Sequence, residues 1–337
     1  MSMDSLPSYV YLAPAVSFVS TWMVVVWLLR RFSDRILDHP NERSLHRQPV
    51  PRTGGIGVAA GIAVSALSVS PSEWWPLWVG AVVLVVVSFV DDLVGLPVIG
   101  RLIVHLLAAG GLVGWFLVDD LGWAGAAFAI IGVAWMVNLY NFMDGMDGLA
   151  GGMTLFGFGF LAMAAWVAGD HSLMLVSLSI AAAAGAFLWF NFHPARIFLG
   201  DAGSTTLGFL AAGLGLIGWK NGSWSLGVPL LVFSPFIVDA SVTLARRLLR
   251  GEKVWQAHRS HYYQRLALAG WGHRKTASVE YGLMILCGLS ALACQSASGP
   301  LCFVIIGAVA VLYLAAAWLV TMVEHKAARR GAVVGWS

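Results

Sequence analysis

The stretch Trp75–Asp92 reads WPLWVGAVVLVVVSFVDD, an apolar run that ends on two adjacent aspartates. A helix needs roughly 20 predominantly apolar residues to cross the hydrocarbon core of a bilayer, and this run comes close to that length. No charged residue precedes Asp91 within it. The stretch therefore predicts a membrane-spanning helix that ends in an acidic pair.

Apolar runs of similar length recur on both sides of this one. Of the 337 residues, 59% are hydrophobic and 11% are charged, whereas a soluble domain carries about 25% charged residues. This composition excludes a water-soluble globule and predicts an all-α, polytopic membrane protein that forms a single domain over residues 1–337. We expect about eleven transmembrane helices, at Tyr9–Leu29, Gly54–Val69, Trp75–Val90, Leu102–Val118, Ala124–Leu139, Met153–Val167, Leu173–Phe190, Thr205–Gly218, Gly227–Leu249, Ala277–Cys294 and Cys302–Val323.

The first and last runs are expected to be ordinary spans. The first run follows no basic segment and has no small-residue cleavage site, so we expect it to be retained rather than removed as a signal peptide. Cys287, Cys294 and Cys302 lie in or beside the last two runs without a paired spacing. We therefore expect these cysteines to serve packing in the membrane rather than a disulfide.

Lysine and arginine residues fall almost entirely on one side of these spans. Alternate threading places the joints 30–53, 91–101, 140–152, 191–204 and 250–276, with the C-terminal tail, on that side, and Lys220 on the other. Cytoplasmic loops carry the excess of Lys and Arg, so this side is predicted to be the cytoplasm and the N-terminus to lie outside. The basic residues are Arg30, Arg31, Arg35, Arg43, Arg47, Arg52, Arg101, Arg196, Arg250, Lys253, Arg259, Arg265, Arg274, Lys275, Lys326, Arg329 and Arg330. Topology and anionic headgroups account for most of them without a substrate.

The same joints also carry acidic and amide residues, which the distribution of basic residues does not explain. They are Asp91, Asp92, Asn138, Asn141, Asp144, Asp147, Asn191 and Asp201. Carboxylates at the ends of membrane helices are costly to desolvate, so a cluster of them indicates a functional site. Between Asn138 and Asp147 a polar residue recurs at every third position, which keeps these side chains on one slowly drifting helix face.

The clustered groups favour a hard divalent cation. They offer oxygen ligands without the Cys and His spacing of a zinc site, so we expect Mg²⁺, with Mn²⁺ as a possible substitute. Neighbouring side chains point about 100° apart on a helix, and we therefore expect Asp91 and Asp92 to serve two different roles. A lone histidine is more often a structural or surface group than a catalyst, which is the expectation for most histidines of this chain.

Five motifs in a fixed order resemble those of the polyprenyl-phosphate N-acetylhexosamine-1-phosphate transferases, which form glycosyltransferase family 4. The resemblance covers most of the chain, and the short motifs are most similar to the O-antigen-initiating branch. The motifs are Asp38–Gly55 (DHPNERSLHRQPVPRTGG), Asp91–Leu96 (DDLVGL), Asn138–Gly152 (NLYNFMDGMDGLAGG), Asn191–Ser204 (NFHPARIFLGDAGS) and His258–Leu266 (HRSHYYQRL).

This resemblance implies an enzyme of the bacterial inner membrane whose active site faces the cytoplasm. Such an enzyme transfers a HexNAc 1-phosphate from a UDP-N-acetylhexosamine to polyprenyl (undecaprenyl) phosphate and releases UMP. The product starts a surface polysaccharide, such as the O-antigen of lipopolysaccharide. Membrane lipid is the expected surrounding partner, and no nucleic acid is expected.

Residue roles follow from the resemblance position by position. Asn141 and Asp201 would hold the metal, while Asp91 and Asp92 would be catalytic groups facing the lipid phosphate and the reacting diphosphate. Substrate binding would involve Thr53 near the diphosphate, Asp144, Asp147 and Asn191 on the nucleotide side, and Phe198 stacked on uracil.

The loop that contains His258, Arg259 and His261 matches the family's histidine loop, which closes over the sugar diphosphate. We expect both histidines to be catalytic and Arg259 to bind substrate. The loop departs from the triple-histidine form of the muramyl-pentapeptide branch, which favours a simple hexosamine donor. The sequence leaves open the amino sugar, the pathway and the oligomeric state, a dimer included.

Other functions fit the residues less well. An intramembrane aspartyl protease would need Gly where Phe198 stands, and its aspartates should lie within the membrane. A CDP-alcohol phosphotransferase would need an Ala-Arg continuation that Asp147–Gly152 lacks. A transporter would place acidic groups at the midplane between inverted repeats, and only Asp239 is so placed. For Asp239 two interpretations remain: a pair with Arg246 or Arg247 on a Pro-bent helix, or a role in a lipid groove.

Overall fold

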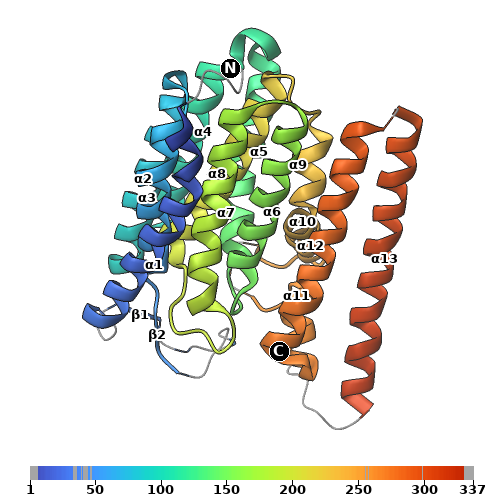
Figure 1. The fold of residues 1–337 in the computed structure, drawn as a ribbon. Coiled ribbons are helices and arrows are strands. Elements are labelled where there is room, and N and C mark those ends of the chain that lie inside the picture. Colours follow the sequence, from blue (N-terminus) through green and yellow to red (C-terminus); the bar gives the residue numbers. More distant parts are fainter. Residues whose placement is uncertain are drawn as a thin grey trace.

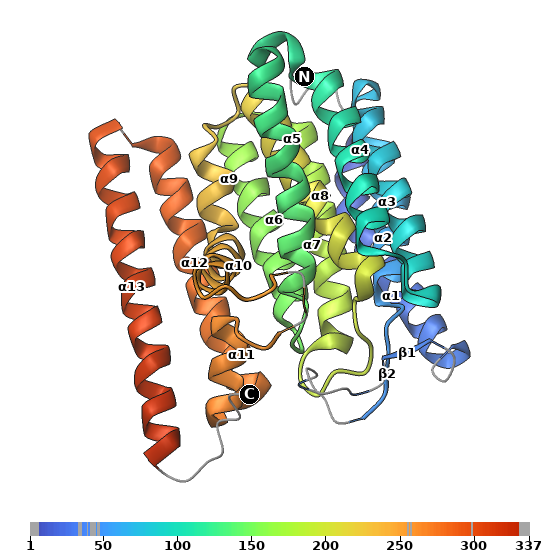
Figure 2. The ribbon, with the colours of Figure 1, turned by 180° about the vertical axis from the view of Figure 1, so that it is seen from behind.

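The apolar runs fold into long helices that lie side by side in one bundle (Figures 1 and 2). The computed structural model describes residues 7–32, 36–38, 40, 45, 48–254, 256, 258–297 and 299–329. Part of the Asp38–Gly55 motif, with Arg35, Arg43, Arg47 and Arg330, lies outside the described residues. The helices are α1 (Ala13–Arg31), α2 (Gly54–Val69), α3 (Trp75–Val94), α4 (Val98–Phe116), α5 (Val118–Phe142), α6 (Leu149–Val167), α7 (His171–Asn191), α8 (Gly200–Lys220), α9 (Gly227–Val232), α10 (Ser234–Leu249), α11 (Tyr262–Leu266), α12 (Gly272–Ser296) and α13 (Gly299–Arg329).

The predicted class, an all-α polytopic membrane protein, is confirmed. Among the described residues, nine helical segments are long and apolar enough to cross a membrane. A tenth predicted span, α2, is an apolar helix of only 16 residues. One small antiparallel hairpin is added to the helices, in which β1 (Leu37–Asp38) pairs with β2 (Val50–Pro51).

The predicted span Gly227–Leu249 is not one helix. It divides into α9, of 6 residues, and α10, of 16 residues. Pro235 lies in the first turn of α10, where it lacks an N–H and its ring prevents α9 from continuing. In both ribbon views α10 is seen end on, so it runs across the bundle rather than along it (Figures 1 and 2). The sequence predicted a single span here, and only the interpretation of Asp239 on a Pro-bent helix allowed for a bend.

Helix α8 lies at the centre of the bundle. In its most apolar stretch 83% of the residues are buried, against 11% in α13. Gly, Ala, Ser and Thr are frequent along α8, and small residues let membrane helices approach closely. One close approach of two backbones joins Gly203 of α8 to Gly55 at the start of α2.

Gly55→Ala tests this approach. The added methyl group would lie 2.4 Å from the backbone N of Gly203 and 2.5 Å from its Cα, and backbone atoms cannot rotate away. We expect the free energy of unfolding to fall by about 1–3 kcal/mol, seen as a lower midpoint of thermal unfolding in detergent. Gly110→Ala in α4, where the methyl group would meet nothing within 4 Å, is the matched control. Equal midpoints for the two variants would contradict the prediction.

The predicted motif joints meet at one end of the bundle, near β1 and β2 in Figure 1. The Gly54 and Gly55 amides donate to the carbonyls of Phe198 and Leu199 at 2.9 and 2.7 Å. These bonds tie the segment before α2 to the segment before α8. Residues that are far apart in sequence are thereby brought to the same end.

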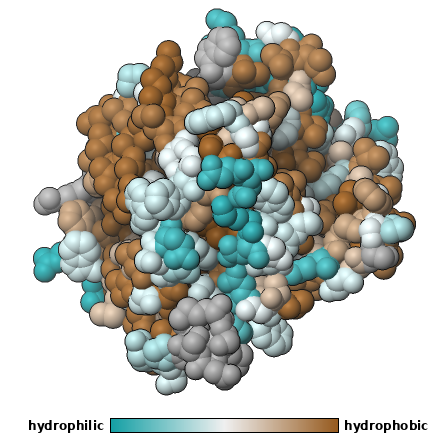
Figure 3. Space-filling view, turned by 90° about the horizontal axis from the view of Figure 1, so that it is seen from above, coloured by the Kyte–Doolittle hydropathy of each residue, from teal (hydrophilic) through white to brown (hydrophobic). Residues whose placement is uncertain are grey.

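The opposite end, viewed in Figure 3, gathers hydrophilic side chains towards its centre inside a largely hydrophobic rim. Lys220, the basic residue predicted on this side, lies 2.9 Å from Asp120. The turn between α12 and α13 also lies here (Figure 1), and it joins Cys294 to Cys302 in a disulfide. The expectation that these two cysteines only pack was wrong, because the turn between two antiparallel helices brings them together. Cys287 is buried and free.

Candidate active site

The acidic pair closes α3, and its two carboxylates face different partners. Asp91 accepts hydrogen bonds from the Leu96 amide at 2.6 Å and from Arg101 at 2.8 Å. Asp92 accepts a longer bond from the Ala202 amide, at 3.4 Å, and lies 3.5 Å from Arg52. The two side chains therefore diverge as their adjacency on a helix predicts, and Asp92 caps the first turn of α8.

Asp201 lies in that first turn of α8, beside the acidic pair. Its carboxylate is 3.4 Å from Arg101 and within hydrogen-bond reach of Asn141 and Asp91. The preceding residue, Gly200, has φ +74°, and a Cβ there would lie 2.5 Å from the Arg52 carbonyl oxygen. Glycine is therefore required for the chain to enter α8 beside Asp92.

Asp144 approaches the same cluster from the segment that follows α5. Its side chain is half-buried. Burial raises the pKa of the Asp144 carboxyl, and the negative charges of Asp201 and Asp92 raise it further. Carboxylates from three separate segments thus lie close enough to repel one another.

This cluster fits a hard divalent cation. Oδ1 of Asp92 is buried, lies 3.5 Å from Arg52 and accepts no hydrogen bond among the described residues, so it keeps lone pairs that a cation can use. The nearby donors from Asp91, Asn141 and Asp201 are also oxygen atoms, which is the set that Mg²⁺ prefers. Arg52 and Arg101 offset part of the negative charge.

Arg52 and Arg101 were not predicted as site residues, because both were counted among the basic residues of the predicted cytoplasmic side. For Arg52 a signal was present, since it directly precedes Thr53 in the PRTGG segment. For Arg101 no pattern set it apart from the other basic residues.

Thr53 and Phe198 lie next to each other through backbone bonds. The Phe198 amide donates to the Pro51 carbonyl at 2.7 Å, and its own carbonyl accepts from Gly54. Thr53 is 2% exposed, and its hydroxyl has no hydrogen-bond partner among the described residues. The Phe198 side chain is half-buried. Both residues thus adjoin Arg52 and the acidic cluster, while their contacts to a substrate remain predictions.

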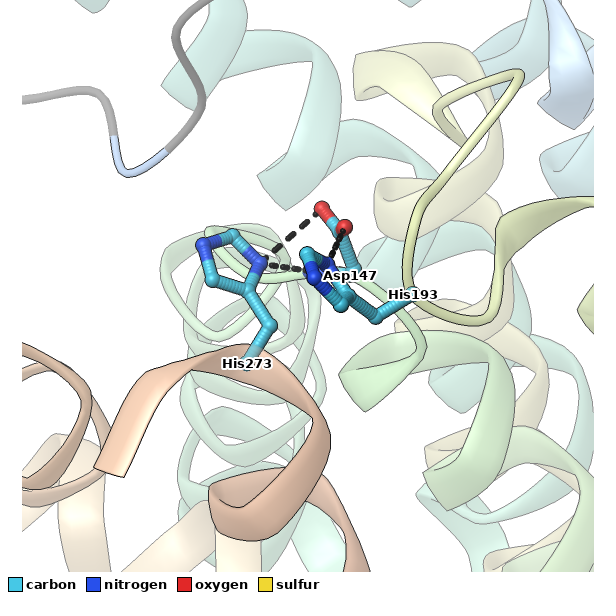
Figure 4. A group of neighbouring side chains, drawn as sticks. All are labelled: Asp147, His193 and His273. Atoms are coloured by element: carbon cyan, nitrogen blue, oxygen red, sulfur yellow. Dashed lines mark hydrogen bonds and ion pairs between the residues drawn. The ribbon is translucent and has the colours of Figure 1, made fainter.

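Asp147 and Asn191 belong to a second group. Asn191 is buried. Its side-chain amide accepts a hydrogen bond from the Gly148 amide at 3.0 Å and donates one to the Ile197 carbonyl at 2.9 Å, so it links two segments of the backbone. The Asp147 carboxylate contacts two histidines, His193 at 2.7 Å and His273 at 3.1 Å (Figure 4). Burial raises the pKa of Asp147, but the hydrogen bonds to His273 and His193 outweigh it and hold the pKa below its usual value.

The two histidines around Asp147 were expected to be structural or surface groups. His193 lies within the NFHP segment, which was a usable signal, whereas His273 follows the histidine loop and belongs to no motif that was identified. Only the fold brings them together.

The histidine loop is held by Asp239 of α10. Nδ1 of His261 lies 3.2 Å from Asp239, which also accepts from the amides of Tyr262 and Tyr263 at 3.0 and 3.1 Å. His261 is 2% exposed. The Asp239 carboxylate therefore caps the start of α11.

Of the two interpretations of Asp239, the pair with Arg246 or Arg247 is not found among the described residues. Arg247 lies 2.7 Å from Glu252, and Arg246 donates to the Tyr262 hydroxyl at 2.9 Å. The backbone amides at the start of α11 donate hydrogen bonds to the Asp239 carboxylate instead, because a helix N-terminus carries N–H groups without partners inside the helix.

His258 stands beside His261, with ring centroids 4.9 Å apart, and its Nδ1 is 2.9 Å from the Ser260 hydroxyl. Burial, together with His261 and the Arg247 charge, lowers the pKa of His258 to about 4. His258 is therefore neutral at pH 7. Arg259 between them is half-buried.

A tyrosine places this loop close to the acidic cluster. The Tyr263 hydroxyl donates to the Phe142 carbonyl at 3.3 Å, one residue after Asn141. The histidine loop and the candidate metal ligands therefore lie at the same end of the bundle, as alternate threading of the spans predicts.

The sequence of the chain matches a family model and several known proteins. Residues 74–218 match the family model described as glycosyl transferase family 4. The chain is 29% identical over 298 residues to a probable undecaprenyl-phosphate N-acetylglucosaminyl 1-phosphate transferase of Bacillus subtilis, covering 82% of this chain and 83% of that protein. It is 26% identical to an undecaprenyl-phosphate alpha-N-acetylglucosaminyl 1-phosphate transferase of Yersinia pestis, covering 75% and 76%. A phospho-N-acetylmuramoyl-pentapeptide-transferase of Moorella thermoacetica is 27% identical, covering 83% and 96%.

The matched region contains the acidic pair of α3, the Asn138–Gly152 segment and Asp201, which are the residues that converge in the structure. The protease and transporter alternatives have no counterpart in these matches. These matches support the resemblance of the chain to the polyprenyl-phosphate N-acetylhexosamine-1-phosphate transferases of glycosyl transferase family 4.

Proposed function

We propose that this chain transfers a HexNAc 1-phosphate from a UDP-N-acetylhexosamine to polyprenyl phosphate on the cytoplasmic face of the bacterial inner membrane. The observation that carries the proposal is the convergence of Asp91, Asp92, Asn141, Asp144 and Asp201 beside Arg52 and Arg101. The names of the relatives supply the substrate class. The histidine loop, HRSHYYQRL, favours a simple hexosamine over a muramyl-pentapeptide donor.

The reaction exchanges one phosphoanhydride for another. An oxygen of the lipid phosphate attacks the sugar-bearing phosphorus, and UMP leaves. The second pKa of a phosphate monoester is about 6, so much of the nucleophile is already ionised at neutral pH. Charge compensation and in-line positioning therefore supply most of the acceleration.

The residues of the cluster divide these tasks. Mg²⁺, or Mn²⁺ in its place, would be held by Asp201 and Asn141, and would offset charge on the diphosphate. Arg52 and Arg101 are half-buried and carry fixed positive charge next to the carboxylates. We infer that each arginine can contact a phosphate oxygen when substrate is present, because guanidinium groups bind phosphate in a bidentate manner.

A direct assay tests the proposal. Membranes that contain the protein would be incubated with polyprenyl phosphate and, in turn, radiolabelled UDP-GlcNAc, UDP-GalNAc, UDP-QuiNAc, UDP-FucNAc and UDP-MurNAc-pentapeptide. A labelled lipid diphosphate and UMP should form with at least one of the four simple hexosamines. Product from the muramyl donor alone would overturn the donor assignment, and absence of product from every donor would overturn the reaction.

His258→Ala should raise KM for the UDP-sugar several-fold and leave KM for lipid phosphate unchanged, because His258 lies on the polar loop beyond the helices. With its pKa near 4, the imidazole stays neutral between pH 5 and 8, so the ratio of variant to wild-type activity should be constant over that range. His325→Ala, on the exposed face of α13, is the control. Steady-state kinetics with each substrate varied in turn would measure this, and a defect confined to the lipid substrate would contradict it.

A further inference from the structure

Asp147, His193 and His273 come from three separate segments and point towards one another (Figure 4). Asp147 follows α5, His193 follows α7, and His273 begins α12. One ligand atom from each, two imidazole nitrogens and a carboxylate oxygen, lies within 4.8 Å of the other two.

The contacts of His273 direct its inward nitrogen, Nδ1, towards the Asp147 carboxylate. Its Nε2 lies 3.1 Å from the Leu45 carbonyl oxygen, which can only accept, so Nε2 carries a proton. Its Nδ1 lies 3.4 Å from the Asp147 amide, which can only donate. That same Nδ1 is 3.1 Å from Oδ1 of Asp147. The Nδ1–Oδ1 contact is shorter than the contact to the amide, so a proton on Nδ1 bridges the two groups without a metal, and a cation bound here would take the place of that proton.

The other contacts resemble the surroundings of a metal site. The backbone amide of Ala195 donates a hydrogen bond to Oδ2 of Asp147 at 3.1 Å, which orients the carboxylate. A metal-bound histidine usually donates its outer N–H to a backbone carbonyl, as His273 does to Leu45. With metal-to-ligand distances of about 2.0–2.2 Å, ligand atoms lie roughly 3–3.5 Å apart. The two contacts of Asp147 with His193 and His273, at 2.7 and 3.1 Å, are near this spacing, and all three ligand atoms lie within 4.8 Å of one another.

We propose that Asp147, His193 and His273 form a second metal site, which takes a transition-metal ion of the Zn²⁺ class. Two imidazoles and one carboxylate are the ligands of Zn²⁺ and Co²⁺ rather than of Mg²⁺. The His193 side chain is 41% exposed, which leaves one side open for water or a further ligand. The site thus differs in chemistry from the all-oxygen cluster around Asp201.

Occupation of this site would affect the donor, an effect that rests on the proposed function. A bound metal ion would coordinate the Asp147 carboxylate, which is predicted to line the nucleotide side of the substrate site. Zn²⁺ should therefore raise KM for the UDP-sugar several-fold and leave KM for lipid phosphate unchanged.

The test uses the full-length protein in detergent with millimolar Mg²⁺ present to occupy the oxygen cluster. Zn²⁺ would be added to one equivalent, and X-ray absorption at the zinc edge would report its ligands. Co²⁺ titration, followed by its visible absorption, would give the affinity. His193→Gln and His273→Gln are the variants, and His325→Gln on the exposed face of α13 is the matched control.

We expect one tightly bound ion with two imidazole ligands, and at least a roughly tenfold loss of Co²⁺ affinity in each site variant but not in the control. Because the His193 side chain is partly exposed, His193→Gln should fold normally, which a wild-type thermal midpoint without added metal would verify. Affinity unchanged by both variants, or a zinc spectrum without imidazole, would overturn the site. A site confirmed by spectroscopy, with no change in KM for the donor, would overturn only its link to the nucleotide.

Discussion

Asp201→Asn is expected to remove nearly all transfer activity and to raise the Mg²⁺ concentration needed for the remainder. The substitution preserves shape but replaces an anionic ligand with a neutral one. Asp201 lies between Arg101, Asn141 and Asp91, so its charge acts at the centre of the cluster. Loss of a group that merely orients a ligand weakens metal binding about 10–100-fold, and loss of a ligand should weaken it more.

Removal of the metal should have the same consequence in the unaltered protein. EDTA should abolish transfer, and Mg²⁺ or Mn²⁺ should restore it. The measurement is initial rate against free Mg²⁺ for both proteins, with Asp120→Asn as control because Asp120 lies at the opposite end beside Lys220. A normal Mg²⁺ dependence in Asp201→Asn, or full activity after thorough chelation, would remove Asp201 from the metal site.

Much of the fold was accessible from the sequence because the bilayer restricts the alternatives. Backbone polar groups must be satisfied within each span, so apolar length alone predicts helices. A bend at Pro235 was one interpretation of Asp239, but the division into two helices was not predicted, because a long apolar run tolerates a change of direction once neighbouring helices enclose it. The disulfide between Cys294 and Cys302 depends on the turn between α12 and α13, which short-range spacing does not reveal.

The candidate site was predictable where charge stood out against an apolar background. Asp91, Asp92, Asp144 and Asp201 are conspicuous at helix ends, and the structure brings them together. Arg101 was hidden among basic residues that topology already explains. His273 was not predicted beside Asp147 for another reason. It lies 126 positions further along the chain, and only packing of α12 against α6 makes the two residues neighbours.

Asp91→Asn and Asp92→Asn are expected to differ, with the larger loss in Asp92→Asn. Both oxygens of Asp91 are engaged by short hydrogen bonds, from Leu96 and Arg101. Oδ1 of Asp92 accepts no hydrogen bond from any residue that the structure describes. Because Oδ1 of Asp92 has only an ion pair with Arg52 at 3.5 Å and no hydrogen bond, Asp92 is the better candidate for chemistry on the lipid phosphate, whereas Asp91 is better placed to position Arg101.

A pH–rate profile decides what Asp92 contributes. General base catalysis supplies about 10²–10⁴-fold, and a base matters most where the lipid phosphate is still protonated. If Asp92 is a base, Asp92→Asn should lose most activity at low pH and recover in part as pH rises through about 6–7. If Asp92 forms a covalent intermediate, pH should not rescue the variant, and the wild type should release UMP from UDP-sugar without lipid acceptor. Equal losses in both variants, without pH dependence or acceptor-free UMP release, would exclude both roles and leave positioning of metal and substrate as the task of the pair.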